Sequence, residues 1–195
     1  KNNINFSHVK EFTVEAGRPD CLNAEKKLRA MEEAGVNRIS INPQTMHDRT
    51  LVTIGRQHTV KQIYEAFTAI RKCNIPVVNM DLIVGLPQER IIDIKYSLDK
   101  MLDFYPENLT VHTLALKKTS PLFQICNDFE FISAVEASQV FDYASLVAEK
   151  LGMSPYYLYR QHYMLGNLAN IGYAKQGTEC IYNMQMMEEQ YTVIG

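Results

Sequence analysis

The chain has 195 residues, of which 46% are hydrophobic and 22% charged, and its formal net charge is −2. This composition is that of a globular protein, and it excludes a disordered, collagen-like or coiled-coil chain. The charge balance predicts no large basic face, so we expect no nucleic-acid partner. The sequence contains no apolar run of the roughly 18–20 residues that a membrane helix needs, and its first residues lack the apolar core of a signal peptide. We therefore expect a cytoplasmic protein with no membrane partner.

The cysteines support the same compartment. Cys21, Cys73, Cys126 and Cys180 are widely spaced, and no pair has the C-x-x-C spacing of a zinc or redox motif. Four free thiols in a reducing cytoplasm are the expected state. We predict no metal site made by residues of this chain.

Strands and helices alternate along most of the chain. In the first part of the chain, the periodicity predicts a strand at 11–15, a helix at 24–34 that ends at Gly35, a strand at 38–41 and a short helix at 48–54. A further helix begins at the capping box of residues 59–62. After it, the pattern predicts a strand at 77–84, a helix at 90–105, a strand at 109–116 and a helix at 131–151. Parallel strands joined by helices imply an α/β fold, either a doubly wound sheet or a barrel.

The last 40 or so residues have a different pattern. Residues 156–160 resemble one more strand, but beyond Gln161 the periodicity is interrupted by Gly166, Gly172 and Gly177. We interpret residues 1–154 as the repeated strand–helix units. Residues 155–195 are interpreted as the end of the repeat and the start of another segment.

Polar residues interrupt apolar runs where the predicted strands end. Glu15, Gln44, Asp81 and His112 occupy such positions, and ligands of α/β sheets and barrels bind at the carboxyl ends of the strands. A carboxylate inside an apolar strand is costly to bury unless it is paired. Asp81 is therefore either satisfied by backbone amides or a nearby arginine, or it faces a ligand.

Together with Arg56, these residues suit a polar metabolite. Carboxylates accept hydrogen bonds from ribose hydroxyls or an ammonium group, and an arginine holds a carboxylate. The sequence contains no nucleophile–base motif, no P-loop and no dinucleotide fingerprint. The residues alone thus predict an α/β protein with a polar-metabolite pocket at the strand ends.

Three segments, in this order and spacing, resemble a known family. They are FTVEAGRP at 12–19, GVNRISINPQ at 35–44 and NMDLIVGLP at 79–87. They resemble the radical S-adenosylmethionine enzymes of the oxygen-independent coproporphyrinogen III oxidase (dehydrogenase) family. Segments at 155–161, 164–168, 170–173 and 180–183 resemble its clostridial and bacillar branch, so the resemblance covers roughly residues 10 to 195.

The resemblance implies a fold. The chain would be part of an incomplete (β/α)6 barrel that lacks its first strands. Residues 1–154 would form central and later βα units, and residues 155–195 the end of the barrel and the start of the family's C-terminal region. An opened barrel exposes a strand edge, so we predict self-association.

The resemblance also implies cofactors and binding residues. Glu15, Gln44, Arg56, Asp81 and Ala115 match family positions that contact S-adenosylmethionine. The C-x-x-x-C-x-x-C motif that holds the family's [4Fe-4S] cluster does not occur here, so we expect the cluster ligands outside this chain and the chain alone to be inactive. Catalytic residues are not assigned.

The implied reaction is radical oxidative decarboxylation of two propionates of coproporphyrinogen III to vinyl groups. It gives protoporphyrinogen IX in haem biosynthesis and needs an electron donor protein. Arg18 and Arg160 are candidates for binding the propionates by charge alone.

Three other interpretations stay open. The first is another radical S-adenosylmethionine enzyme, such as one that modifies RNA, although the acidic balance and the C-terminal pattern argue against it. The second is a haem-binding chaperone of the same family, with His112 or His162 as axial ligand. The third is a scaffold without a ligand, which leaves Asp81 unexplained.

Overall fold

The computed structural model describes residues 8–19, 25–115, 129–160 and 168–188. Its centre is a six-stranded sheet with the order β1-β2-β3-β4-β6-β5. Neighbouring strands are parallel from β1 (Thr13–Gly17) through β2 (Arg38–Gln44) and β3 (Val77–Val84) to β4 (Asn108–Thr113). β6 (Asn170–Ala174) runs antiparallel to both β4 and β5 (Ser154–Tyr159). The sheet is therefore parallel at one end and antiparallel at the other.

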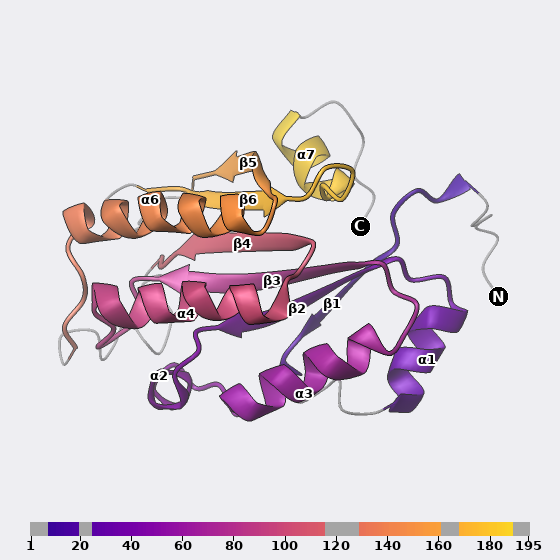
Figure 1. The fold of residues 1–195 in the computed structure, drawn as a ribbon, viewed down its shortest axis with the longest axis horizontal. Coiled ribbons are helices and arrows are strands. Elements are labelled where there is room, and N and C mark those ends of the chain that lie inside the picture. Colours follow the sequence, from indigo (N-terminus) through magenta and orange to yellow (C-terminus); the bar gives the residue numbers. More distant parts are fainter. Residues whose placement is uncertain (1–7, 20–24, 116–128, 161–167, 189–195) are drawn as a thin grey trace.

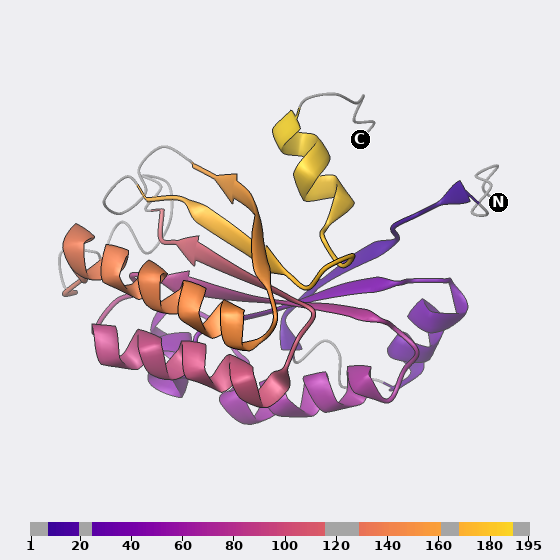
Figure 2. The same cartoon turned by 45° about the horizontal axis from the view of Figure 1, so that its top comes forward.

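The helices are distributed unequally over the two faces. α1 (Glu25–Glu33), α3 (Val60–Arg71), α4 (Ile91–Phe104) and α6 (Ala134–Lys150) cover one face, with the short α2 (Asp48–Thr53) on the same side (Figures 1 and 2). α7 (Ile181–Glu188) is the only described helix on the other side (Figure 2). In the described part of the chain, no helix is long and apolar enough to cross a bilayer.

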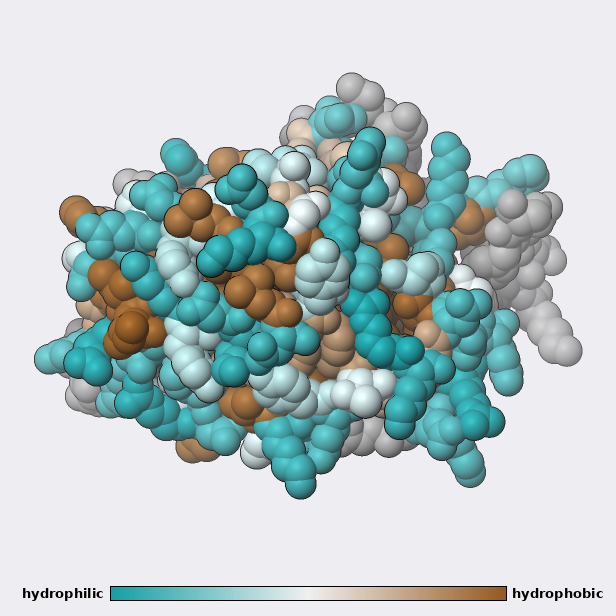
Figure 3. Space-filling model, in the orientation of Figure 1, coloured by the Kyte–Doolittle hydropathy of each residue, from teal (hydrophilic) through white to brown (hydrophobic). Residues whose placement is uncertain are grey.

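The hydrophobic core lies between the sheet and the four long helices. The strand side chains that point to the helices are buried, and so are Ile63, Ala66, Phe67 and Ile70 of α3. The buried strand residues are Ile39, Ile41, Val78, Met80, Leu109 and Val111. The outer surface of these helices is mainly hydrophilic with scattered apolar side chains (Figure 3), among them the exposed Ile92, Val135 and Leu146.

Local signals fix where the helices begin. The capping box predicted at Thr59 is confirmed. The backbone N–H of Gln62 donates to the Thr59 hydroxyl, and the side-chain oxygen of Gln62 accepts from the backbone N–H of Thr59 at 2.8 Å. Ser133 and Glu136 form the same arrangement at α6. Each box satisfies backbone donors that the first helical turn would otherwise leave unpaired.

The predicted α/β fold is confirmed, with shifted boundaries at some elements. The strand at 77–84 has the predicted limits, whereas β1 begins and ends two residues later than predicted and β4 ends at Thr113. β6 has no predicted counterpart. Gly172, interpreted as an interruption, lies inside this strand.

Position 172 of β6 needs a glycine because the rings of Tyr156 and Tyr157 occupy the space that a side chain would fill. A Cβ atom at this position would come within 2.6 Å of Tyr157 Cε1 and 2.9 Å of Tyr156 Cε1. Such contacts mark a site where another group approaches the backbone closely. The glycine that weakened the sequence signal is thus required by the packing of β5 on β6.

Candidate functional site

A row of polar side chains crosses the sheet on the face opposite the four long helices. Side chains alternate along a strand, so in β3 Asn79 and Asp81 point away from the face that carries Val78 and Met80. Parallel pairing then places neighbouring residues beside them, since Ser40 is opposite Asn79 and Thr110 opposite Asp81. We call Glu15, Ser40, Asn79, Asp81, Thr110 and His112 the polar row.

Asn79 organises the polar row. Its side-chain amide donates to Ser40 Oγ at 2.8 Å and to Asp81 Oδ1 at 2.7 Å. Its carbonyl oxygen accepts from Thr110 Oγ1 at 3.1 Å. Both amide donors and the carbonyl are therefore in use, which fixes the orientation of the Asp81 carboxylate.

Asp81 has different partners from those that the sequence suggested. The expected structural partners were backbone amides or an arginine. The partners in the structure are Asn79 and His112, whose Nε2 lies 3.6 Å from Asp81 Oδ2. A carboxylate offers about four acceptor positions, so Asp81 keeps capacity for a ligand on the open side of the sheet.

Glu15 lies on the same face as Asp81. Desolvation by the surrounding protein raises the pKa of Glu15, and the negative charge of Asp81 raises it further, although its side chain keeps contact with solvent. The pKa of Glu15 is lowered in turn by the charge of Arg38, a hydrogen bond with Ser40 and the charge of His112. Two carboxylates that disfavour each other's charge are a suitable place for a ligand with cationic or hydroxyl donors.

Three of the proposed site residues lie at or beyond the carboxyl ends of the strands. Gln44 is buried at the end of β2 with a φ of 71°, Arg56 is half-buried after α2, and Ala115 follows β4. Desolvation lowers the pKa of Arg56, and the nearby positive charge of Arg18 lowers it further. Within the described residues, Arg56 has no carboxylate partner at ion-pair distance, so a ligand carboxylate suits this edge.

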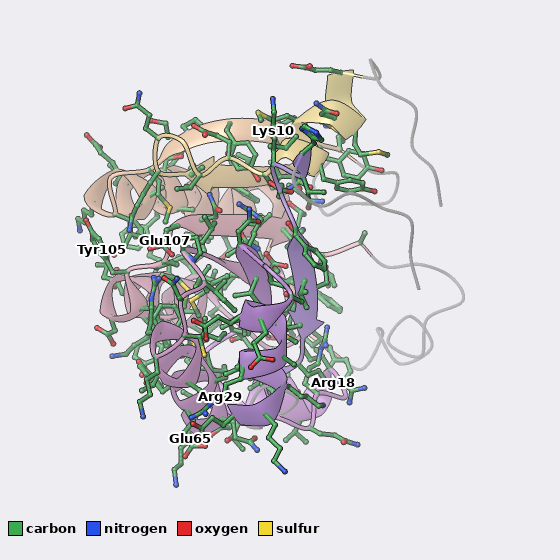
Figure 4. The ribbon with its side chains drawn as sticks, turned by 90° about the vertical axis from the view of Figure 1, so that its right-hand side faces the viewer. Lys10, Arg18, Arg29, Glu65, Tyr105 and Glu107 are labelled. Carbon is green, nitrogen blue, oxygen red and sulfur yellow. The ribbon has the colours of Figure 1, made fainter. Side chains whose placement is uncertain are left out.

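The structure thus brings some of the predicted residues together and leaves others apart. Glu15, Asp81 and His112 share one face, and direct side-chain contacts join Asp81 to His112. No such contact joins Asp81 to Gln44, Arg56 or Ala115 in the part of the chain that is described. Arg18 and Lys10 lie at opposite ends of the β1 segment (Figure 4), and Arg160 is exposed after β5. His162 lies outside the described residues.

A cavity of about 470 Å³ opens onto the polar row. Its walls come from β1, β2 and β3 on one side and from α7 and the residue before it on the other. They comprise Glu11, Phe12, Thr13, Glu15, Arg38, Ser40, Asn79, Cys180, Tyr182 and Asn183. A hollow of about 600 Å³ between α1 and α3 includes Arg29 and Glu65, labelled in Figure 4, and lies on the helix side of the sheet, away from the polar row.

No role was predicted for Ser40, Asn79 or Thr110. For Asn79 a signal was present, because polar residues two apart in an apolar strand share a face. Ser40 and Thr110 carry no such signal, since hydroxyl residues are common in strands. They belong to the site only through the register of the sheet.

The described residues contain no group of three or more His, Cys, Asp or Glu that could hold a metal ion. Cys73 and Cys180 are free thiols, while Cys21 and Cys126 lie outside the described residues. The placement of cluster ligands outside this chain stays a prediction.

Comparison with known proteins identifies the family. Residues 6–101 match the Radical SAM superfamily, a segment that extends to α4 and contains Glu15, Gln44, Arg56 and Asp81. The chain is also 43% identical over 188 residues to the oxygen-independent coproporphyrinogen-III oxidase-like protein HemZ of Bacillus subtilis, which covers 96% of this chain. This chain belongs to the radical S-adenosylmethionine superfamily.

The chain is also similar to further proteins with haem-related names. The heme chaperone HemW of Bacillus subtilis is 34% identical over 119 residues, 61% of this chain. The solved structure of coproporphyrinogen III oxidase HemN from Escherichia coli has the same fold, with a TM-score of 0.69 over 91% of this chain at 16% identity. The chain spans only 37% of HemZ, 31% of HemW and 38% of the HemN structure.

Membership in this superfamily implies S-adenosylmethionine and a [4Fe-4S] cluster as cofactors. The acidic residues of the polar row and Arg56 at the strand ends fit the first of these groups. Glu15 and Asp81 offer acceptors for hydroxyl or ammonium donors, and Arg56 offers donors for a carboxylate.

Proposed function

We propose that this chain is part of a radical S-adenosylmethionine oxidoreductase that converts two propionates of coproporphyrinogen III to vinyl groups. The products are protoporphyrinogen IX and CO2, and the hydrogen atom that each propionate loses leaves as part of 5′-deoxyadenosine. One observation carries the proposal: Asn79 fixes the Asp81 carboxylate on the open face of the sheet, the face that also carries Glu15. The similarity to HemZ and to anaerobic coproporphyrinogen III oxidases supports the same substrate.

The residues would divide the binding of S-adenosylmethionine between them. Asp81 and Glu15 would accept hydrogen bonds from its ribose hydroxyls or its ammonium group. Arg56 and Gln44 would bind its carboxylate or its other polar groups at the strand ends, and the small side chain of Ala115 would leave room. When bound, this cofactor and the reduced cluster supply the radical chemistry that removes hydrogen from a propionate.

The charge distribution of the site favours such a cofactor. S-adenosylmethionine carries a sulfonium cation, and the two carboxylates of Glu15 and Asp81 disfavour each other when the site holds no cation. A cation near them relieves this repulsion and favours the ionised form of Glu15. The proposal therefore explains why two acidic side chains share one face of the sheet.

A haem-chaperone role is the second candidate, supported by the similarity to HemW. Its ligand on this face would be His112. That imidazole already faces Asp81 at 3.6 Å, so iron coordination through Nε2 would separate the two groups. We therefore favour the oxidoreductase.

The test uses the complete polypeptide, reconstituted anaerobically with iron and sulfide. A chemical reductant replaces the electron donor protein, and release of 5′-deoxyadenosine is measured with and without coproporphyrinogen III. We expect substrate-dependent release and a fall of at least about tenfold in the Asp81→Asn variant, since loss of a charged hydrogen bond is worth about 1.5–3 kcal/mol. No release from wild-type protein with an intact cluster would overturn the proposal, and a haem titration of wild type and His112→Ala would then test the chaperone role.

A further inference from the structure

α7 differs from every other described helix of eight or more residues because none of its side chains is buried. Tyr182 is 58% exposed, Met186 39% and Met187 40%. Short helices are normally stabilised by burying an apolar face. α7 is held at its start instead, where the Ile181 N–H donates to Glu11 Oε2 at 2.8 Å and Asn183 Nδ2 donates to the Tyr156 hydroxyl at 3.1 Å.

The apolar residues of α7 face aromatic residues of β5. A cavity of about 190 Å³ lies between the two elements. We call Tyr157, Tyr159, Tyr182, Met186 and Met187, which line it, the tyrosine–methionine wall. Gly172 allows the Tyr157 ring to lie against the sheet backbone, so the glycine in β6 shapes this wall.

The tyrosine–methionine wall adjoins the larger cavity on the polar row. Tyr182 and Asn183 line both this cavity and the larger one that contains Glu15, Ser40 and Asn79. The two cavities are therefore neighbours on either side of Tyr182 and Asn183, and a ligand larger than either one could contact both. The two cavities together fall within the usual range of roughly 300–1,000 Å³ for small-molecule pockets.

The larger cavity also contains a buried cation. Arg38 is 4% exposed, and its Nη1 donates to the Thr178 carbonyl at 2.8 Å. Among the described residues no carboxylate lies at ion-pair distance from Arg38. Glu11, on the same cavity wall, already accepts from Thr13, Cys180 and Ile181. A buried guanidinium without a charged partner suits a ligand carboxylate.

We propose that a propionate-bearing tetrapyrrole binds across the two cavities, with its ring on the tyrosine–methionine wall and one carboxylate on Arg38. A flat apolar ring with acidic substituents matches an aromatic and thioether wall that ends at a guanidinium. The proposal rests on the proposed function in naming the tetrapyrrole as the ligand. The competing occupant of the wall is another part of the longer polypeptide.

The first experiment measures binding of coproporphyrin III, the stable oxidised form of the substrate, by fluorescence titration of the complete polypeptide without cluster or S-adenosylmethionine. In the variant Tyr182→Ser/Met187→Ser, we expect the Kd to rise at least about tenfold, the effect of losing central aromatic contacts. The matched control is Ile92→Ser/Tyr96→Ser, which changes exposed residues of α4, and its Kd should stay within about twofold. An unchanged Kd in the folded wall variant would overturn the proposal, because another segment would then cover the wall.

The second experiment tests the role of Arg38. Arg38→Gln should weaken binding of coproporphyrin III about tenfold or more but leave binding of its tetramethyl ester nearly unchanged, and Arg38→Lys should restore part of the loss. Circular dichroism melting shows whether each variant folds. If the Arg38 variants unfold, the wall variants alone decide.

Failure of this proposal is distinguishable from failure of the proposed function. A protein that binds coproporphyrin III on the wall but releases no 5′-deoxyadenosine contradicts only the reaction. A protein that is active and binds coproporphyrin III equally well in all folded variants contradicts only this site.

Discussion

At the scale of single residues, Asn79 determines the geometry of the candidate site. It links Ser40 on β2, Asp81 on its own strand and Thr110 on β4. An asparagine in this role is not interchangeable with a carboxylate or an alkyl group, because it uses two donors and one acceptor at once. Its side chain connects the register of three strands to the orientation of one carboxylate.

The substitution Asn79→Leu removes all three of these hydrogen bonds. We expect the free energy of unfolding to fall by about 1–3 kcal/mol, since buried partners lose their hydrogen bonds. Affinity of the reconstituted complete polypeptide for S-adenosylmethionine should fall at least about tenfold because Asp81 is no longer oriented. Urea unfolding and equilibrium binding measure the two effects.

The control for this prediction is Asn74→Leu, which changes an exposed asparagine between α3 and β3. Both measurements should stay close to wild type there. An Asn79→Leu protein that folds and binds S-adenosylmethionine normally would show that Asp81 needs no help from the amide.

A second residue-scale prediction concerns Gly172. Gly172→Ala introduces a Cβ that collides with Tyr157, so we expect a loss of about 1–3 kcal/mol in unfolding free energy. In a Tyr157→Ala background the same change should have a smaller effect, because the closer ring is gone and only the contact with Tyr156 remains. Equal effects in both backgrounds, measured by urea unfolding, would mean that the cause is not this contact.

At the scale of elements, Glu89 connects the end of β2 to the start of α4. It is 2% exposed and accepts a hydrogen bond from the Thr45 hydroxyl. Desolvation raises the pKa of Glu89 above its ordinary value of 4.5, while the hydrogen bonds from threonine oppose the shift. The folded state therefore binds this proton more tightly than the unfolded state, and ionisation of Glu89 destabilises the fold as the pH rises.

Glu89→Gln removes that ionisation. Relative to wild type, the variant should gain unfolding free energy progressively as the pH rises above about 4.5, and the gain should be absent at lower pH. Glu136→Gln should show the opposite sign, because hydrogen bonds from Ser133 lower the pKa of Glu136 and its charge stabilises the fold at higher pH. Urea unfolding of both variants across pH checks the two slopes, and parallel slopes would contradict the assignment.

The elements also show how far sequence signals reach. The limits of β3 and the capping box at Thr59 were predictable because short-range patterns determine them. β6 was not predictable, since Gly172 is favourable only when Tyr157 of another strand packs on it. Asp81 was recognisable as unusual in an apolar strand, but its partner His112 depends on pairing between β3 and β4.

At the scale of the whole molecule, the sheet has two different edges. Among the described strands β1 pairs only with β2, and β5 pairs only with β6 while α7 packs beside it. A strand with an unpaired edge presents free backbone donors and acceptors to another chain. The β1 edge is therefore where we expect the isolated chain to associate.

Sedimentation velocity of the 195-residue chain over a range of concentrations tests this expectation. We expect concentration-dependent oligomers, because pairing at β1 satisfies its outer backbone groups. Leu158→Lys, on the exposed part of β5, serves as the control and should leave the oligomers unchanged. A chain that stays monomeric and unfolds cooperatively would contradict the prediction.

The backbone of Gln44 has a consequence for how such a protein evolves. A φ of 71° suits glycine, and a residue with a Cβ held there costs roughly 1 kcal/mol or more. Gln44→Gly should therefore remove this backbone cost and, at the same time, the buried amide at the strand ends, a gain and a loss in the same substitution. A lineage that no longer needed a ligand at this edge would be free to drift to glycine at position 44, and a lineage that needed one would keep glutamine there despite its backbone cost.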